Sequence, residues 1–394
     1  MLQATLAHVN IKFEMIKIAH IQLLPLLSGV QRVCLDELIR LDNTKFEKYL
    51  ICKEPGPLTE EAQKYGIKCF YIPSLVRHIS LKNDTKALLS LWKLIRLNRF
   101  DIVHTHSSKT GVLGRVAAWL NRTKLIVHTV HGFSFPIAKN KMQYLLFWSM
   151  EKIGSLCGDK IICLHENDAR IAKEIVKVSD DSIHIIGNGV DVKKFSPYDA
   201  DKKKSLRKII AESDDDTLII GMIGRLWPQK NPMCLLYAVE KIISENTNLK
   251  CLFVGDGELH EEMMNFIRHK KLDKNVKLLG WRYDTPNVLN VFDIFVLPSL
   301  WEGMPLAILE AKSCALPCVA SDIPGNNNII NNYHDGLLFN LDSGPDELYN
   351  KIKLLISNPD VRKNIGSAAR ENILSSHDIE ARIEKIQNLY LEYI

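Results

Sequence analysis

The chain has 394 residues, of which 46% are hydrophobic and 25% are charged. These proportions are ordinary for a folded soluble protein and exclude a disordered tail, a collagen and a coiled coil. At about 100–200 residues per domain, the length predicts two domains. Nine cysteines without any C-x-x-C pair argue against a disulfide framework or a zinc ribbon, and they favour a reducing, cytoplasmic compartment.

The net charge of +5 is unevenly distributed along the chain. Residues 1–198 contain 28 Lys and Arg against 18 Asp and Glu, whereas the remainder contains 23 against 28. The excess is concentrated between Lys64 and Lys160, with 16 basic and 4 acidic residues. Such a field attracts an anionic membrane surface or nucleic acid, and no nucleic-acid-reading motif accompanies it. We therefore expect a membrane surface as partner and no nucleic acid.

Residues 84–99 predict an amphipathic helix inside this basic region, with Lys86, Lys93 and Arg96 on its positive side. A surface helix packed on a sheet is the simpler interpretation, and a membrane-contacting helix is the alternative. No apolar run reaches the ~18 residues that a membrane span needs.

Strand and helix patterns alternate along the first half of the chain. Residues 1–14 precede a strand at 16–21, a glycine turn at Ser28-Gly29 and a helix at 30–41. Later strands are expected at 48–52, 67–72, 102–104, 125–129, 160–164 and 182–186, with helices such as 111–120 and 166–176 between them. This alternation predicts a parallel sheet with helices on both faces.

A second block of the same kind begins at residue 217. Its strands are expected at 217–223, 250–254, 276–279, 294–297 and 317–320. The fold class is therefore α/β, with two doubly wound, Rossmann-like domains at 1–195 and 196–376. A C-terminal helix at 377–394 is expected to pack back on the first domain. Ligands bind such sheets outside the carboxyl ends of the strands, so we expect the two domains to face each other across a cleft that holds the site.

The loop after the first strand of the second block contains Gly224, Arg225 and Lys230. Glycine lets the backbone approach a ligand closely. The Arg fork and the Lys point charge, five residues apart on one loop, can converge on a diphosphate. A solvated basic loop is the alternative.

The segment from Glu302 to Glu310 follows another strand of this block, 294–297. Pro305 suits the first turn of a helix, and Gly303 leaves the backbone N–H groups open to a phosphate oxygen. The two glutamates, eight residues apart, can lie at opposite ends of one nucleotide-linked ligand.

Several motifs together resemble the retaining glycosyltransferases of family 4, which have the GT-B fold. They are G-R-L-x-P-x-K-N-P, V-G-D-G-E-L and P-S-x-x-E-G-M-P-L-x-x-L-E-A. The stretches D-I-V-H-T-H-S-S-K-T-G and V-H-T-V-H-G-F are similar to the bacterial capsule and O-antigen branch. The first loop departs from the family, because Ser28-Gly29-Val30-Gln31 has one glycine where members often have two.

The resemblance implies a role for each matching residue. Arg225 and Lys230 would hold the donor diphosphate, with Gly224 beside them and Gly29 approaching from the other domain. Glu302 would contact the donor sugar and Glu310 the ribose. The implied donor site also includes Gly303, the N–H groups of Met304 and Leu306, His131 near the reacting sugar, and Arg282 near the nucleobase.

The histidines at 104, 106, 128 and 131 raise the question of zinc. Two loose pairs without an acidic or cysteine partner indicate loop and cleft histidines rather than a metal site. The D-x-D matches at Asp199/Asp201 and Asp214/Asp216 lie in polar stretches and are expected to be solvated turns. The family is typically metal-independent, so we expect neither a metal nor another cofactor.

The implied reaction transfers a hexose or N-acetylhexosamine from a UDP-sugar to a polyprenyl-pyrophosphate-linked saccharide, with retention, in O-antigen or capsule synthesis. The enzyme would lie peripherally on the cytoplasmic face of the inner membrane. Three alternatives remain open: a glycolipid synthase with a phospholipid or diacylglycerol acceptor, a sugar-nucleotide epimerase, and a catalytically inactive partner that binds nucleotide sugar.

Overall fold

The structure is a computed structural model that describes residues 15–394 except 215, 246 and 247. Residues 1–14, which precede the first predicted strand, lie outside the described part. Contacts divide the chain into two compact units. Unit 1 contains the residues up to Thr129 together with Leu145–Ile161 and Leu389–Ile394, and unit 2 contains Val130–Tyr144 and Ile162–Asn388. The domain limits given above stay predictions.

The first sheet has seven strands in the order β3-β2-β1-β4-β5-β6-β7. The pairings from β3 through β2, β1 and β4 to β5 are parallel, as the strand–helix alternation predicted. The strands are β1 Ile16–Ile21, β2 Phe46–Cys52, β3 Lys68–Tyr71, β4 Ile102–His106, β5 Leu125–Val130, β6 Lys160–Cys163 and β7 Ile183–Ile185. The chain order reverses between β1 and β4, which makes this pair the switch point of the sheet.

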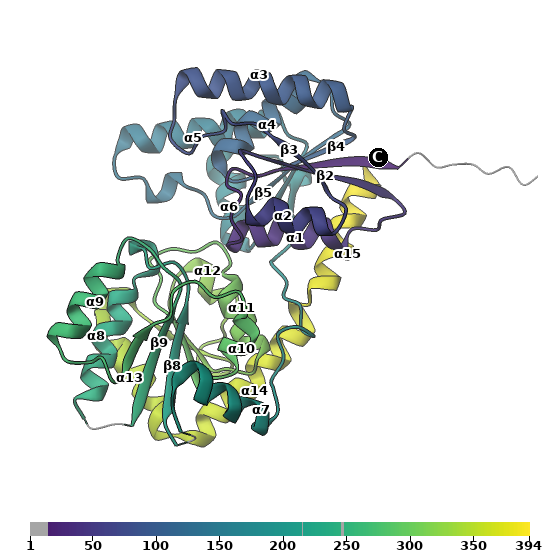
Figure 1. The fold of residues 1–394 in the computed structure, drawn as a ribbon. Coiled ribbons are helices and arrows are strands. Elements are labelled where there is room, and N and C mark those ends of the chain that lie inside the picture. Colours follow the sequence, from purple (N-terminus) through teal and green to yellow (C-terminus); the bar gives the residue numbers. More distant parts are fainter. Residues whose placement is uncertain (1–14, 215, 246–247) are drawn as a thin grey trace, which may run out of the picture. The chain divides into compact units, whose positions relative to one another are not determined.

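Helices cover both faces of the first sheet (Figure 1). They are α1 Gly29–Arg40, α2 Pro57–Lys64, α3 Leu81–Asn98, α4 Ser108–Leu120, α5 Lys141–Leu156 and α6 Glu166–Ile171, which continues as a wider turn to Val176. Alternate strand residues point to opposite faces. Tyr49 and Ile51 therefore pack with α3 and α4, whereas Leu50 and Cys52 pack with α1 and α2.

The second sheet has six strands in the order β10-β9-β8-β11-β12-β13, with its switch point between β8 and β11. The strands are β8 Leu218–Ile223, β9 Leu249–Val254, β10 Val276–Leu278, β11 Ile294–Leu297, β12 Cys318–Ser321 and β13 Leu337–Phe339. The last strand was not predicted, because three apolar residues are too short a run to show a period. One continuous apolar core fills the space between this sheet and its helices.

The helices that follow in the chain are α7 Ala200–Leu206, α8 Pro232–Ile243, α9 His260–His269, α10 Thr285–Leu289, α11 Leu306–Ser313, α12 Pro324–Asn327, α13 Gly344–Ser357, α14 Pro359–Ser376 and α15 Ile379–Glu392. The end of α15, from Leu389, belongs to unit 1, where Tyr390 is fully buried.

The structure tests the predictions about disulfides and about the helices. All nine cysteines are free, as their spacing predicted. Among the described residues, no helix is both long and apolar enough to cross a bilayer. The predicted amphipathic helix at 84–99 is α3, which begins three residues earlier, at Leu81, because Ser80 caps it by accepting a hydrogen bond from the Asn83 N–H at 3.4 Å.

Candidate functional site

The motif residues of unit 2 lie after two neighbouring strands. Arg225 and Lys230 follow β8, and Glu302 precedes α11 in the connection from β11. Strands β8 and β11 pair in parallel at the switch point of the second sheet. Two loops separated by more than 70 residues in sequence therefore reach the same edge of one sheet, where α/β proteins bind ligands.

A direct ion pair joins the two predicted motifs. The Lys230 Nζ lies 2.5 Å from the Glu302 Oε1, and the Ser299 hydroxyl donates to the same oxygen at 2.6 Å. The Glu302 side chain is 7% exposed and that of Lys230 is 19% exposed. Because both groups are largely removed from water, each holds the other in a defined orientation. The structure thus brings into direct contact two residues that the resemblance assigned to one donor site.

Glycines make the approach to α11 unusually close. A Cβ on Gly303 would lie 2.7 Å from the His131 carbonyl oxygen, and one on Gly325 would lie 2.5 Å from the Gly303 oxygen. Gly132 has a φ of +97°, a conformation that favours glycine. These three glycines let the backbones of residues 131–132, 303 and 325 pack against one another, so that the start of α11 is held beside His131.

The start of α11 differs slightly from its prediction. Pro305 is the N-cap in an extended conformation, and the helix begins at Leu306 rather than at the proline. The Met304 carbonyl accepts a hydrogen bond from the Asn188 side chain at 2.8 Å. Glu310 lies in the second turn and is buried. The close-packed backbone of Gly303 thus lies just before this short helix, and the buried carboxyl of Glu310 lies within it.

The β8 loop is braced by the loop after β9. Gly255 has a φ of +131°, and a Cβ there would lie 2.0 Å from the Gly224 oxygen. The Arg225 guanidinium stacks on Trp227, 4.7 Å from the ring centre. Gly224 thereby presents a close-packed backbone while Arg225 is held over an aromatic face.

Arg282, predicted near the nucleobase, lies in the connection after β10. Its guanidinium forms a two-point contact with Asp284, at 3.0 and 2.7 Å. The neighbouring Trp281 is largely exposed. The fork of Arg282 is therefore occupied by Asp284, and the exposed ring beside it offers a stacking surface.

His131 is held in its neutral form. Burial lowers its pKa to about 3, and the positive charge of Arg382 acts in the same direction. A neutral imidazole at working pH can donate one hydrogen bond and accept another, but it brings no charge to the site. Its backbone contact with Gly303 places it beside the start of α11.

Two residues of unit 2 were missed by the sequence analysis. His165 caps α6, and its Nε2 lies 3.3 Å from an Asp168 carboxylate oxygen. Burial lowers the pKa of His165, opposed by the hydrogen bond that its ring donates to the Gly303 backbone, and burial raises the pKa of Asp168 to about 7. The only signal in the sequence is H-x-x-D at a helix start, which is also an ordinary cap.

The predicted residues of unit 1 fall into two groups. Gly29 is the first residue of α1, and nothing lies within 4 Å of where its Cβ would be, so its backbone is open. The prediction that His104, His106 and His128 are loop or cleft residues is wrong. They lie in β4 and β5 and are buried, because helices cover both faces of this sheet.

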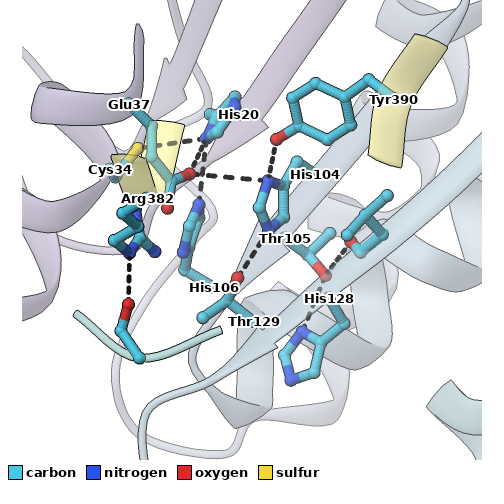
Figure 2. A network of polar contacts seen from close by, with 12 residues as sticks. His20, Cys34, Glu37, His104, Thr105, His106, His128, Thr129, Arg382 and Tyr390 are labelled. Carbon is cyan, nitrogen blue, oxygen red and sulfur yellow. Dashed lines mark hydrogen bonds and ion pairs between the residues drawn. The ribbon is translucent and has the colours of Figure 1, made fainter. Parts of the chain in front are cut away.

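The four histidines considered for zinc, at 104, 106, 128 and 131, do not form one group in the structure. His128 contacts Thr105 at 2.9 Å, whereas His104 and His106 meet His20 and Glu37 (Figure 2). Among the described residues, this is the only group of three or more His, Cys, Asp or Glu side chains that could hold a metal ion. Of the D-x-D residues, Asp199 caps α7 by accepting from the Lys202 N–H at 2.8 Å, as expected of a solvated turn.

Two doubly wound sheets, with a cationic loop and an acidic helix start at the switch point of the second, define the GT-B class of glycosyltransferases. The HepE protein of Anabaena, solved with UDP and glucose, has this fold: its TM-score is 0.83 at 18% identity, covering 96% of this chain and 100% of that one. Sucrose-phosphate synthase of Thermosynechococcus elongatus has a TM-score of 0.79 at 18% identity, covering 96% of this chain and 98% of that one.

Sequence comparison gives the family. Residues 27–194 match the model for Glycosyltransferase Family 4, and residues 203–372 match that for glycosyl transferases group 1. The chain is 44% identical to the UDP-Gal:alpha-D-GlcNAc-diphosphoundecaprenol alpha-1,3-galactosyltransferase of Escherichia coli, over 96% of this chain and 97% of that protein. It is 25% identical to the capsular polysaccharide glycosyltransferase CapM of Staphylococcus aureus, over 84% and 88%. The chain therefore belongs to this family and is a glycosyltransferase.

Proposed function

We propose that this glycosyltransferase moves galactose from UDP-galactose to a GlcNAc-diphosphopolyprenol acceptor, with retention of configuration, in O-antigen synthesis. The E. coli relative with that donor and acceptor in its name supports the choice, since it is similar along nearly the whole chain. Galactose is one of the hexoses that the family resemblance implied.

The ion pair between Lys230 and Glu302 is the structural observation that carries the donor-binding part of this proposal. A donor diphosphate competes with the carboxylate for Lys230, and the freed carboxylate can then accept hydrogen bonds from the sugar hydroxyls. Arg225, held over Trp227, supplies the second cation. The N–H groups of Met304 and Leu306 complete the phosphate contacts at the start of α11. Glu310 takes the ribose.

Charge on the leaving diphosphate grows as the bond from the sugar C1 to the phosphate oxygen breaks. Cationic groups that meet this charge lower the barrier, because they interact more strongly with the transition state than with the ground state. The acceptor oxygen forms the new bond on the same face of the sugar, and its proton passes to the departing phosphate oxygen. Neutral His131 orients the sugar without adding charge. Arg225 and Lys230 take the place of a divalent ion in this scheme.

A panel of donors tests the proposal. The purified enzyme is incubated with UDP-galactose, UDP-glucose or UDP-N-acetylglucosamine and a synthetic GlcNAc-diphospholipid, and products are measured by mass spectrometry and NMR. We expect one added hexose from UDP-galactose, in the α configuration. Transfer from none of the three donors, or equal transfer to diacylglycerol, would contradict the proposal, and the second result would favour a glycolipid synthase.

Matched variants distinguish the loss of a donor-site contact from a general loss of folding. Glu302→Gln should abolish most of the transfer, since the amide pairs with Lys230 less well and accepts fewer hydrogen bonds. Lys241→Ala is the control, because Lys241 pairs with Asp346 on the surface of the same unit. Normal turnover by Glu302→Gln would remove this residue from the site.

We further propose that unit 1 docks on the cytoplasmic face of the inner membrane, where a polyprenyl acceptor presents its head group. Helix α3 buries Ala87, Leu91 and Ile95 and leaves basic residues such as Lys86 and Lys93 exposed. It is thus a surface helix on the sheet, as the simpler interpretation had it, and its charged side stays available. Attraction to anionic lipid is worth roughly 1 kcal/mol per basic residue near the surface.

Helix α5 supports this proposal in a way that the sequence analysis missed. Of its 16 residues only Glu151 and Gly154 are buried. Leu145 is 60% exposed and Leu156 is 70% exposed. An exposed apolar helix on a basic unit is typical of a surface that enters the lipid interface.

Co-sedimentation with liposomes tests the docking. Binding should require anionic lipid, weaken at high salt, and fall when Lys86, Lys93 and Arg96 are changed to Glu or when Leu145 is changed to Glu. The control changes Lys271, Lys274 and Lys363, exposed in unit 2, to Glu. If both triple variants lose binding equally, net charge rather than this surface is responsible.

A further inference from the structure

Four buried polar side chains meet at the switch point of the first sheet. We call them the histidine cluster: His20 on β1, His104 and His106 on β4, and Glu37 on α1. All four are fully buried. His20 and His104 are directly paired across the two strands, and His106 follows two residues later on the same face. Strand register and helix packing therefore bring together residues that are far apart in the sequence.

The ligand atoms of the histidine cluster point toward one another (Figure 2). The His20 Nδ1 lies 3.0 Å from the His106 Nε2 and 3.8 Å from the Glu37 Oε2. The same carboxylate oxygen lies 3.7 Å from the His104 Nδ1, and all four ligand atoms lie within 4.8 Å of one another. Ligands in a tetrahedral zinc site, at about 2.0–2.2 Å from the ion, are separated from one another by about 3.4 Å. The observed spacings bracket this value.

The surroundings orient the rings as metal ligands are oriented. The His104 Nε2 contacts the Thr129 hydroxyl at 2.7 Å, so the Nδ1 is the nitrogen that faces the cluster. Outer hydrogen bonds of this kind fix the tautomer of a metal-bound histidine. The Tyr390 hydroxyl lies 2.6 Å from the His104 Nδ1 and the Cys34 Sγ 3.5 Å from the His20 Nδ1, which places two further donor atoms at the edge of the cluster.

Electrostatics favour one cation over several protonated rings. The three ring centroids lie 4.4 to 5.2 Å apart, so three protonated imidazoles would repel one another. A single cation among the four ligand atoms adds a favourable charge beside the buried Glu37 carboxylate and leaves the imidazoles neutral.

We propose that the histidine cluster binds one divalent transition-metal ion, with zinc as the best match to three imidazoles and one carboxylate. Imidazole ligands disfavour magnesium and calcium. Four protein ligands leave no open position, so the ion is structural: it ties β1, β4 and α1 together. The site is independent of the proposed function, in which Arg225 and Lys230 serve the donor diphosphate without a metal.

Metal content tests the site directly. The full chain, purified without a histidine tag, is stripped with a chelator and titrated with zinc or with cobalt(II). We expect about one ion per chain by mass spectrometry, the visible absorption bands of tetrahedral cobalt, and a raised melting temperature. Less than about one tenth of an ion per chain, with no cobalt bands, would overturn the proposal and leave a shared proton as the positive centre.

Variants locate the ion. His106→Gln and Glu37→Gln should each retain zinc at least about tenfold less well than the wild type. His128→Gln is the matched control, since His128 is buried on the adjacent strand and contacts Thr105 instead of the cluster. His334→Gln controls for an exposed histidine. Unchanged stoichiometry in His106→Gln and Glu37→Gln would overturn the assignment, and the cobalt spectrum of the wild type decides the question even if a variant fails to fold.

Discussion

The two units place polar residues at equivalent points and assemble them in different ways. In unit 2 the switch point between β8 and β11 carries Lys230 and Glu302, each within a short run of distinctive sequence. In unit 1 the switch point between β1 and β4 carries His20 and His104, which are 84 residues apart and surrounded by ordinary strand residues. Ligand-facing loops must concentrate glycines and charges locally, whereas a buried cluster needs only the register of two strands.

Each unit also contains a fully buried ion pair, and these two pairs differ in their cation. Arg115 pairs with Glu151 in unit 1 at 3.0 Å, and Lys312 pairs with Asp335 in unit 2 at the same distance. Gly154 makes room for the guanidinium, since a Cβ there would lie 2.2 Å from it. Arginine keeps its proton under all ordinary conditions, whereas a buried lysine can release its own.

Removing the acid of either pair should have the largest effect on stability. Glu151→Ala and Asp335→Ala should each lower the free energy of unfolding by about 3–5 kcal/mol, because a charge is left buried without its partner. The two variants should respond differently to pH. Burial already lowers the pKa of Lys312, and without Asp335 this pKa falls further, so the folded state binds fewer protons than the unfolded state. The loss of unfolding free energy in Asp335→Ala, relative to the wild type, should therefore shrink as the pH rises toward 9. The corresponding loss in Glu151→Ala should stay constant.

Native-state hydrogen exchange, read separately for the two units, measures both deficits. Glu151→Gln and Asp335→Asn are the matched controls, since they keep the shape and one hydrogen bond. The same pH dependence in both alanine variants would show that the identity of the buried cation is not what distinguishes the units.

The donor loop of unit 2 should give the next largest effect. Arg225→Ala and Lys230→Ala should each lower kcat/KM by about 10²–10³, the loss expected when a group that stabilises leaving charge is removed. Arg225→Lys should recover only part of the rate, because the planar fork that stacks on Trp227 is lost. Steady-state kinetics with UDP-galactose measure these values, with Lys241→Ala as the surface control. Turnover close to normal in both alanine variants would contradict the proposed clamp.

Asp168 should give a smaller effect that depends on pH. Its pKa is raised from 3.8 to about 7, so between these values the folded state holds a proton that the unfolded state has lost. Stability should therefore fall as pH rises through this window and level off above it. Relative to Asp168→Asn, the wild type should lose about 2 kcal/mol of unfolding free energy between pH 5 and pH 8.

Urea unfolding of unit 2 at several pH values measures this difference. Asp360→Asn serves as the control, because Asp360 is exposed. A wild-type curve that runs parallel to that of Asp168→Asn would show that burial does not hold the proton on this carboxyl.

The same contrast explains what the sequence could predict. Strand–helix alternation was enough for both sheets except the short strand β13, and the motifs that contain Lys230 and Glu302 were enough to select two loops that the structure brings into contact. The helix boundaries shifted by one to three residues where Ser80 or Pro305 acts as a cap. His20 and Glu37 could not be predicted as neighbours of His104, because nothing local shows which strand pairs with which. The exposed side chains of α5 were missed for a related reason, since an apolar run reads the same whether it is buried or exposed.

The smallest expected effect is that of divalent ions on the rate of transfer. It distinguishes the two units, because the donor site in unit 2 is proposed to work without a metal and the histidine cluster in unit 1 is proposed to bind one. Transfer from UDP-galactose should be the same within error in EDTA and in millimolar Mg²⁺ or Mn²⁺, because cationic side chains and the start of α11 meet the diphosphate. The assay is read within minutes, so that an ion enclosed by the histidine cluster stays bound. Activity that requires added Mg²⁺ would contradict the metal-free donor site and leave the proposal for the cluster untouched. Activity that is lost only after long chelation, and is restored by zinc together with the melting temperature of unit 1, would instead show that the two switch points are linked through stability.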